Sequence, residues 1–339
     1  MPRLSCIIPV VGNAHGLEST LVSVLEHFPD DCEIIVVHSA PYDDPYDLKS
    51  ELRFIEAPRR TGYVGCVNFG IQVSQSPIVH LLAAGLEATE GWAEAALARF
   101  ADPRVVAVAP VVCNQFDSEQ ILAAGMYYHR GGRVEIRTEL PADTLPLDAT
   151  LADRGTTVAG AFPLARAAFY RRSALNSFGG LLPTSVGNEL AAVELGLSLV
   201  HAGYRTVVEP DCKVLGSAKS CRASHGFAYG LASERLFWRN LPSARSLTAI
   251  ATHPFSMARE LCGSLASGAA ILQLFGRIAA YATLGDCRAR HEQLRAAAAA
   301  ARSRTGGSTD IGLPSQIRID AAHATTRASR PSDVRASRS

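Results

Sequence analysis

The sequence predicts an α/β fold in which helices flank a mostly parallel sheet. Two short runs rich in Ile and Val, at residues 4–10 and 33–39, are typical of strands buried on both faces. Between them, apolar residues recur at helical spacing from Leu17 to Leu25. Strand, helix and strand in this order form a βαβ unit, which places the two strands parallel in one sheet.

The same pattern suggests how the chain is divided. A further apolar run, residues 105–110, is predicted to be another buried strand. We therefore expect one α/β domain at residues 1–235 and a C-terminal helical region at residues 236–300. Residues 301–339 are rich in Ser, Thr, Arg and Gly and contain few large apolar side chains, which predicts a disordered tail.

Composition narrows the class of protein. A chain of 339 residues with 47% hydrophobic content can bury a sizeable core, and a net charge of +1 gives no general attraction to nucleic acid. The eight cysteines include no Cys-x-x-Cys pair, which favours reduced thiols over zinc or disulfides and predicts a cytoplasmic protein. No signal peptide is expected, because the first strand begins at Leu4 without a charged segment and an apolar core of that type.

Five segments of the chain follow one another in the order found in a known family. They are an opening strand and loop at residues 4–13, a glycine-rich turn and helix at 60–70, a loop at 124–132, a strand and helix at 158–180, and a helix end and strand at 202–211. Together they resemble family 2 glycosyltransferases, in particular rhamnosyltransferase-like members, over roughly residues 4–285. The resemblance implies the GT-A fold, a Rossmann-like sheet flanked by helices.

The resemblance also implies a nucleotide-binding region. Its residues would be Pro9, His38, Ser39, Gly62 and Asn68. The family usually has an acidic pair where this chain has His38 and Ser39. A carboxylate suits that position because it accepts two hydrogen bonds from a base or a ribose. Histidine and serine can still form hydrogen bonds, and Asp43 and Asp44 follow closely; the alternative is that His38 is only a polar residue at a strand end.

The glycine-rich turn before residue 63 has two interpretations. Glycine at position 62 lets backbone N–H groups approach a diphosphate, and the start of a helix favours negative charge. The same residues also suit an ordinary turn from a loop into a helix.

The metal-binding motif of the family is replaced. Its Asp-x-Asp position aligns with Ala83 and Gly85, whose side chains offer no oxygen to a hard cation. Glu87 and Glu90 follow, either as ligands on a displaced loop or as solvated surface residues. The sequence therefore assigns no metal ligand, and it speaks against a required divalent cation such as Mn²⁺ or Mg²⁺.

The catalytic carboxylates of the family are altered as well. Counting back from the Ala-Gly-Tyr at residues 202–204 places the acidic pair on Ala191 and Ala192, with Glu194 at the later acidic position. A slip of two residues would bring Glu189 into the position of the general base, which takes the proton of the acceptor hydroxyl. Glu189 and Glu194 are the candidates, and the alternative for each is a glutamate on the helix surface or in its first turn.

A basic segment follows the last predicted strand. The family often has a histidine there that assists metal or diphosphate binding, and this chain lacks it. Lys213, Lys219 and Arg222 could neutralise phosphate directly, which predicts a phosphate-binding site; a basic surface loop is the alternative.

The apolar segment at residues 261–284 is interrupted by Arg277, and it is too short on either side of that arginine to span a membrane. Phe237, Trp238, Phe255 and Phe275 lie among basic residues in this part of the chain. Two interpretations are open: amphipathic helices that rest on the inner face of a membrane, or helices that pack against the main domain.

Two functions are consistent with these features. The first is transfer of a sugar from a nucleotide-diphosphate sugar to a glycan or lipid-linked acceptor in polysaccharide biosynthesis. The second is a pseudoenzyme that binds a nucleotide, a glycan or a partner transferase without turnover. A glutamate at position 189 or 194 that points into the donor cleft would favour the enzyme, and two solvent-facing glutamates would favour the binding protein.

Overall fold

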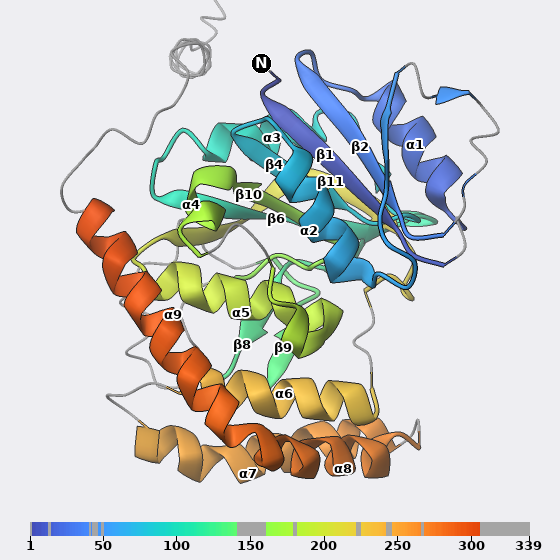
Figure 1. The fold of residues 1–339 in the computed structure, drawn as a ribbon. Coiled ribbons are helices and arrows are strands. Elements are labelled where there is room, and N and C mark those ends of the chain that lie inside the picture. The colour runs from blue at the N-terminus through green and yellow to red at the C-terminus, as the bar shows by residue number, and fades with distance from the viewer. Residues whose placement is uncertain are drawn as a thin grey trace, which may run out of the picture.

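A computed structural model of the chain describes residues 2–12, 15–40, 42, 47–48, 51–140, 161–178, 182–221, 225–241, 246–265 and 268–305. A sheet lies in the upper part of Figure 1, and layers of helices lie beneath it. The predicted α/β class and its mostly parallel sheet are confirmed.

The sheet has nine strands in the order β3-β2-β1-β4-β10-β6-β11-β5, with β7 paired to β6. Its parallel strands are β1 (Leu4–Val10), β2 (Cys32–His38), β3 (Arg53–Glu56), β4 (Ile78–Leu82), β6 (Val105–Asn114) and β11 (Arg205–Gly216). The antiparallel strands are β5 (Glu87–Ala88), β7 (Asp117–Ala123) and β10 (Ala167–Arg171). A separate hairpin joins β8 (Met126–Tyr128) to β9 (Val134–Ile136).

Helices cover the sheet and extend away from it. They are α1 (Leu17–Glu26), α2 (Tyr63–Val73), α3 (Trp92–Arg99), α4 (Arg172–Asn176) and α5 (Gly187–His201). Below α5 in Figure 1 lie α6 (Phe227–Arg239), then α7 (Ser246–Ser264) and α8 (Ala270–Ala280), while α9 (Leu284–Thr305) runs diagonally across the layers. Short 3₁₀ turns at Thr184–Val186 and Tyr281–Thr283 precede α5 and α9.

The core sits where β4 and β10 cross the middle of the sheet. Every residue of both strands is buried, as expected for β-branched and aromatic runs covered on both faces. The His80 ring of β4 stacks on the Phe169 ring of β10, with 3.8 Å between the ring centres. The centre of the Trp92 ring of α3 lies 4.7 Å from that of His80. Burial lowers the pKa of His80 to about 3, so this histidine is a neutral core residue.

The C-terminal helices pack at unusually close range. A Cβ atom added to Gly230 of α6 would lie 2.0 Å from the Gln273 carbonyl oxygen, and one added to Gly276 of α8 would lie 2.0 Å from the Phe227 carbonyl oxygen. Two glycines therefore let the α6 and α8 backbones touch. The expected boundary between residues 235 and 236 falls inside α6, and residues 301–305 of the expected tail continue α9; residues 306–339 lie outside the described residues.

Arg277, which interrupts the apolar segment, lies at the centre of this helical layer. Its side chain is 2% exposed, and its guanidinium lies 2.8 Å from Glu234 of α6 and 2.6 Å from Glu260 of α7. His253 of α7 lies 3.0 Å from Glu234. These four residues, the α6–α8 charge cluster, join three helices. Among the described residues, no helix is long and apolar enough to cross a membrane.

Candidate functional site

A pocket of about 160 Å³ lies at the edge of the sheet where β4 and β11 end. It is lined by the hairpin β8–β9, the segment before β10, the turn after β11, and the helices α5 and α6. The residues on its wall are Met126, Val134, Ile136, Leu164, Ala165, Arg166, Glu189, Leu190, Ser220, Cys221 and Tyr229. The carboxyl edge of such a sheet is where α/β proteins usually bind ligands.

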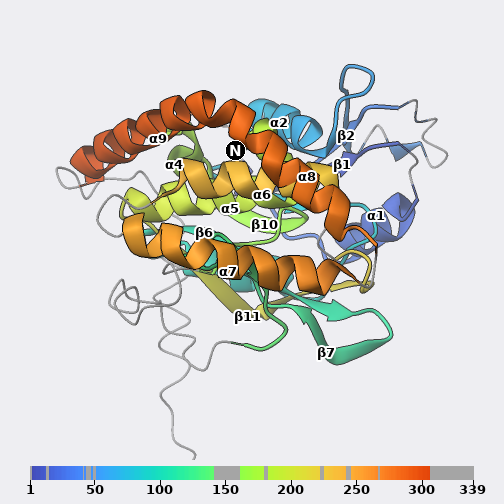
Figure 2. The same cartoon turned by 90° about the horizontal axis from the view of Figure 1, so that it is seen from below.

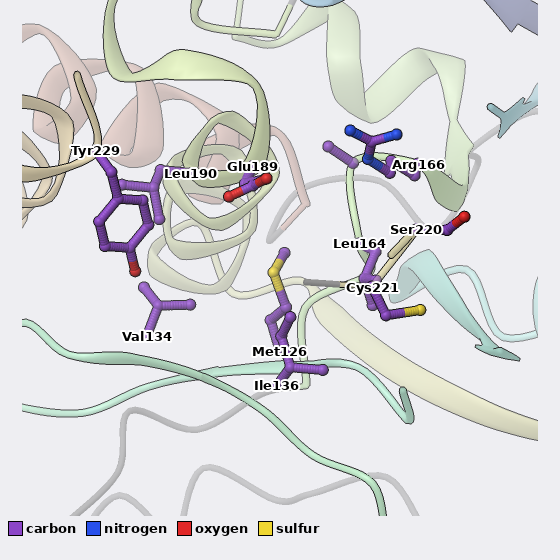
Figure 3. Close-up of a pocket in the computed structure, with 11 residues that line it drawn as sticks. Met126, Val134, Ile136, Leu164, Arg166, Glu189, Leu190, Ser220, Cys221 and Tyr229 are labelled. Atoms are coloured by element: carbon purple, nitrogen blue, oxygen red, sulfur yellow. The ribbon is translucent and has the colours of Figure 1, made fainter. Parts of the chain in front are cut away.

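The polar groups of the pocket are few. Figure 3 shows Arg166 and Glu189 on the upper side of the view, with Met126 and Ile136 below them. Burial, and then the charges of Glu260 and Glu189, raises the pKa of the Tyr229 phenol, so Tyr229 stays a neutral donor. The pocket thus pairs an apolar wall with one carboxylate and one guanidinium.

Glu189 is the predicted catalytic residue that the fold places at the pocket. It lies half-buried in the first turn of α5. The segment that leads into this helix is fixed by α2. The Asn68 side-chain amide of α2 donates to the Leu182 carbonyl (3.0 Å) and accepts from the Leu182 N–H (2.8 Å). The Asn68 side chain, predicted to contact a nucleotide, is thus engaged in positioning the segment that leads to Glu189.

Glu194 lies elsewhere. Five residues along a helix turn the side chain by roughly 140° from that of Glu189. Its carboxylate is 1% exposed and pairs with Arg239 of α6 at 3.3 Å and with Arg290 of α9 at 3.4 Å. It does not line the pocket. Ala191 and Ala192, at the expected acidic pair, are fully buried.

Three of the five predicted nucleotide-binding residues, Pro9, His38 and Ser39, lie at the carboxyl ends of β1 and β2. Pro9 pairs with Val37 near the end of these strands. His38 closes β2, and its Nδ1 lies 2.9 Å from the Ala40 carbonyl oxygen. The Ser39 N–H donates to the Val10 carbonyl. Gly62 precedes α2, and a Cβ atom added to it would have no described atom within 4 Å.

The residues at the former Asp-x-Asp position do not fit a divalent cation. Ala83 and Gly85 follow β4, and the Gly85 N–H donates to the Gly16 carbonyl. Glu87 is in strand β5 opposite Leu215. Among the described residues, no three His, Cys, Asp or Glu side chains gather in a way that could hold a metal ion. Ala83 and Gly85, at the described positions of that motif, offer no side-chain oxygen to Mn²⁺ or Mg²⁺.

The predicted phosphate-binding cations are only partly placed. Lys213 lies within β11 rather than in a loop, and its side chain is exposed. Lys219 is exposed in the turn that leads to Ser220 on the pocket wall. Arg222 lies outside the described residues. The cation that sequence reasoning missed is Arg166; its signal was an arginine directly before a buried strand at residues 167–171.

The profile of the family described as "Glycosyl transferase family 2" matches residues 5–177, just over half of the chain. The chain belongs to this family. The matched residues include β1, β2, the glycine-rich turn and the strand before the missing Asp-x-Asp, so the predicted family is confirmed. The rhamnosyltransferase-like subtype stays a prediction.

The similar proteins are other glycosyltransferases. The human "Probable polypeptide N-acetylgalactosaminyltransferase 8" is 30% identical over 135 residues, which are 35% of this chain and 21% of that protein. This chain therefore spans about a fifth of the length of that curated relative.

Two solved structures are similar to this chain. A mannosyltransferase from Pyrobaculum calidifontis, in complex with GDP-Man and Mn²⁺, is 20% identical with a TM-score of 0.49, and covers 89% of this chain and 87% of its own. GalNAc-T7 with UDP, GalNAc and Mn²⁺ is 16% identical with a TM-score of 0.53, over 76% of this chain and 51% of its own. At such identity the second likeness supports the GT-A fold and nothing finer.

Proposed function

We propose that this protein transfers a sugar from a nucleotide-diphosphate sugar to a hydroxyl of a glycan or lipid-linked acceptor in polysaccharide biosynthesis. One observation carries the proposal: the pocket at the carboxyl edge of the sheet holds Glu189 on its wall and borders the former Asp-x-Asp position. The N–H of Ala83, at that position, donates to the carbonyl of Arg166, a second pocket residue, at 2.8 Å.

The chemistry follows from the position of Glu189. Its carboxylate takes the proton of the acceptor hydroxyl as that oxygen attacks the anomeric carbon of the donor sugar. The bond from the anomeric carbon to the diphosphate oxygen breaks, and the nucleoside diphosphate leaves with the electron pair. Membership of the glycosyl transferase family 2 and the UDP and GalNAc held by the similar GalNAc-T7 structure support a donor of this chemical class.

Binding without turnover is the second candidate. It is favoured by Ala83 and Gly85 in place of metal-binding carboxylates and by the enclosure of Glu194 in ion pairs. In this function the same pocket and strand edge hold a nucleotide or a glycan, and no bond is broken.

Calorimetric titration with UDP, GDP and dTDP, with and without Mn²⁺, tests what the two candidates share. We expect one of the three to bind with a Kd of roughly 1 mM or lower, because the strand edge and the α2 start suit a nucleoside diphosphate. Binding accompanied by sugar release from a donor would support the transferase, and binding with no turnover on any sugar nucleotide would support the second candidate. The absence of binding to all three would contradict both nucleotide functions.

A membrane surface is the proposed location of the enzyme. The polarity of α8 is inverted, because Gln273 and Arg277 are buried while large apolar side chains face outward. The outward set on α7 and α8, the α7–α8 apolar face, comprises Leu247, Ile250, Phe255, Ile271, Leu272, Leu274, Phe275 and Ile278. Figure 1 shows α7 and α8 at the bottom of the molecule, away from the sheet, and Figure 2 views the molecule from that side.

Lipid is the occupant that best suits this face. A protein interface carries hydrogen bonds across its buried surface, whereas Ile271, Leu272, Leu274, Phe275 and Ile278 of α8 offer no polar side chain. A helix with such a face can lie in the boundary between headgroups and acyl chains. This location would bring the pocket near a lipid-linked acceptor.

Sedimentation with vesicles of phosphatidylethanolamine and phosphatidylglycerol tests the location. Replacing Ile271 and Phe275 by serine should lower the bound fraction of protein roughly tenfold, because each change removes an apolar side chain from the lipid. Phe116→Ser is the matched control, because Phe116 is 86% exposed between β6 and β7 and should leave binding unchanged. A wild-type protein that stays in the supernatant, or that forms a dimer through this face in light scattering, would contradict the membrane proposal.

A further inference from the structure

We propose that the Arg166 guanidinium binds the donor diphosphate directly and neutralises its charge without a divalent metal. The inference rests on the proposed function and adds a residue and a mode of binding to it. It begins from the misfit of the metal site: Ala83 and Gly85 supply no oxygen ligand, while the two charges of a diphosphate still require a cation.

Arg166 lies between the two segments that would meet the diphosphate. Its carbonyl oxygen accepts the N–H of Ala83, directly after β4, at 2.8 Å. The neighbouring Ala165 carbonyl accepts the hydroxyl of Tyr63, the first residue of α2, at 3.0 Å. The Arg166 Cζ atom lies 5.9 Å from the centre of the Tyr63 ring. The arginine is thus held beside both the former metal position and the glycine-rich turn.

The charge of Arg166 has no described counterion. Within the described ranges, no carboxylate lies within 4.0 Å of its guanidinium, whereas Arg239, Arg277 and Arg290 each pair with a glutamate. The positive charge of Arg166 acts on two neighbouring residues. Burial raises the pKa of Tyr63 and raises the pKa of Cys221 to about 11, and the charge of Arg166 partly offsets both increases.

The start of α2 adds a second positive feature at this place. The N-cap Gly62 has no side chain to accept the first N–H groups of the helix, and the N-terminus of a helix carries a partial positive charge. A guanidinium beside a positive helix end is stabilised by an anion that contacts both. Because guanidinium presents paired N–H donors, it can bind two phosphate oxygens at once.

Titration with UDP and GDP in buffer containing EDTA tests the assignment. The wild-type protein should bind the preferred nucleotide with an affinity that Mn²⁺ changes by less than roughly twofold. Arg166→Ala should weaken binding of the diphosphate roughly 10- to 100-fold. Arg166→Lys should retain part of the affinity, because it keeps the charge and loses the paired donors.

The matched control is Arg137→Ala. Arg137 also lies over a tyrosine ring, with its Cζ atom 4.2 Å from the centre of the Tyr127 ring, but it does not line the pocket. Its removal should leave nucleotide affinity unchanged. Thermal melting without nucleotide separates a loss of binding from a loss of fold, and Arg166→Lys carries the test if Arg166→Ala does not fold.

The outcomes separate this inference from the proposed function. Binding that requires Mn²⁺, or an Arg166→Ala protein with wild-type affinity, would overturn the role of Arg166 and leave the nucleotide-dependent function in place. Failure of the wild-type protein to bind any nucleoside diphosphate would overturn both.

Discussion

Replacement of Arg277 by alanine is expected to lower the free energy of unfolding by about 3–5 kcal/mol. The guanidinium is the shared partner of two carboxylates, Glu234 of α6, which is 1% exposed, and Glu260 of α7, which is 11% exposed. Its removal leaves both charges without their arginine in a medium of low polarity. Loss of one member of a buried ion pair is costly for this reason, even where the intact pair contributes little.

The remaining members of the α6–α8 charge cluster cannot replace the lost contact. His253 already lies 3.0 Å from Glu234 and 2.7 Å from the Gly131 carbonyl oxygen, so both of its ring nitrogens face an oxygen. Of its hydrogen bonds to described residues, Glu260 would keep that from the Gln273 amide, which donates to it at 2.9 Å. We therefore expect α7 and α8 to separate from α6 before the sheet unfolds.

Urea unfolding followed by circular dichroism measures the effect of the Arg277→Ala substitution. Arg259→Ala is the matched control on α7, because Arg259 is exposed and forms no salt bridge with any described residue; its effect should stay within about 0.5 kcal/mol. Arg277→Lys should fall between the two, since one ammonium group cannot span both carboxylates as the guanidinium does. An Arg277→Ala curve that overlays the wild-type curve would show that the cluster does not hold the helices together.

Replacement of Glu189 by glutamine is expected to lower turnover roughly 100-fold or more, with little change in nucleotide affinity. Glutamine keeps the size of the side chain and loses the ability to take a proton. Glu189 and Arg166 both line the pocket, and the substitution leaves Arg166 and the α2 start, to which the diphosphate is assigned, unchanged, so donor binding should survive. This split between rate and affinity distinguishes a base from a residue that only shapes the pocket.

The measurement compares steady-state rates and calorimetric nucleotide affinities, with the sugar nucleotide that the wild-type protein turns over as donor. Glu119→Gln is the control, because Glu119 is exposed on β7 and does not line the pocket. If Glu189→Gln keeps wild-type turnover while Glu194→Gln loses it in a folded protein, the base is Glu194. Equal affinity and equal rates in both variants would remove both glutamates from the chemistry.

Much of the sheet could be predicted from the sequence, because its signal is local. Runs of β-branched residues predict the strands at residues 33–39 and 105–110, and the structure places β2 and β6 there. The loss of carboxylates at Ala83 and Gly85 is likewise visible from the residues alone. Neither statement depends on which segments meet in space.

Only some of the site residues could be predicted from the sequence. A two-residue slip was needed to propose Glu189, and only the turn of α5 into the pocket distinguishes it from Glu194. Asn68 matched a nucleotide-binding motif, yet its amide binds the backbone of Leu182, 114 residues away. Arg166 belongs to no sequence motif. It becomes a candidate for diphosphate binding because it lies beside Ala83 and Tyr63.

The family, the class of fold and the lack of carboxylates at residues 83 and 85 thus follow from residue type and order alone. Which charges are enclosed and which face the pocket depends on the packing of the helices against one another. Arg277 interrupts an apolar segment of the sequence. Because Gly230 and Gly276 let α6 and α8 approach closely, the Arg277 side chain is buried against Glu234. The physical reason is that residue type and spacing report local backbone preference, whereas the partner of a buried charge depends on which helices pack together.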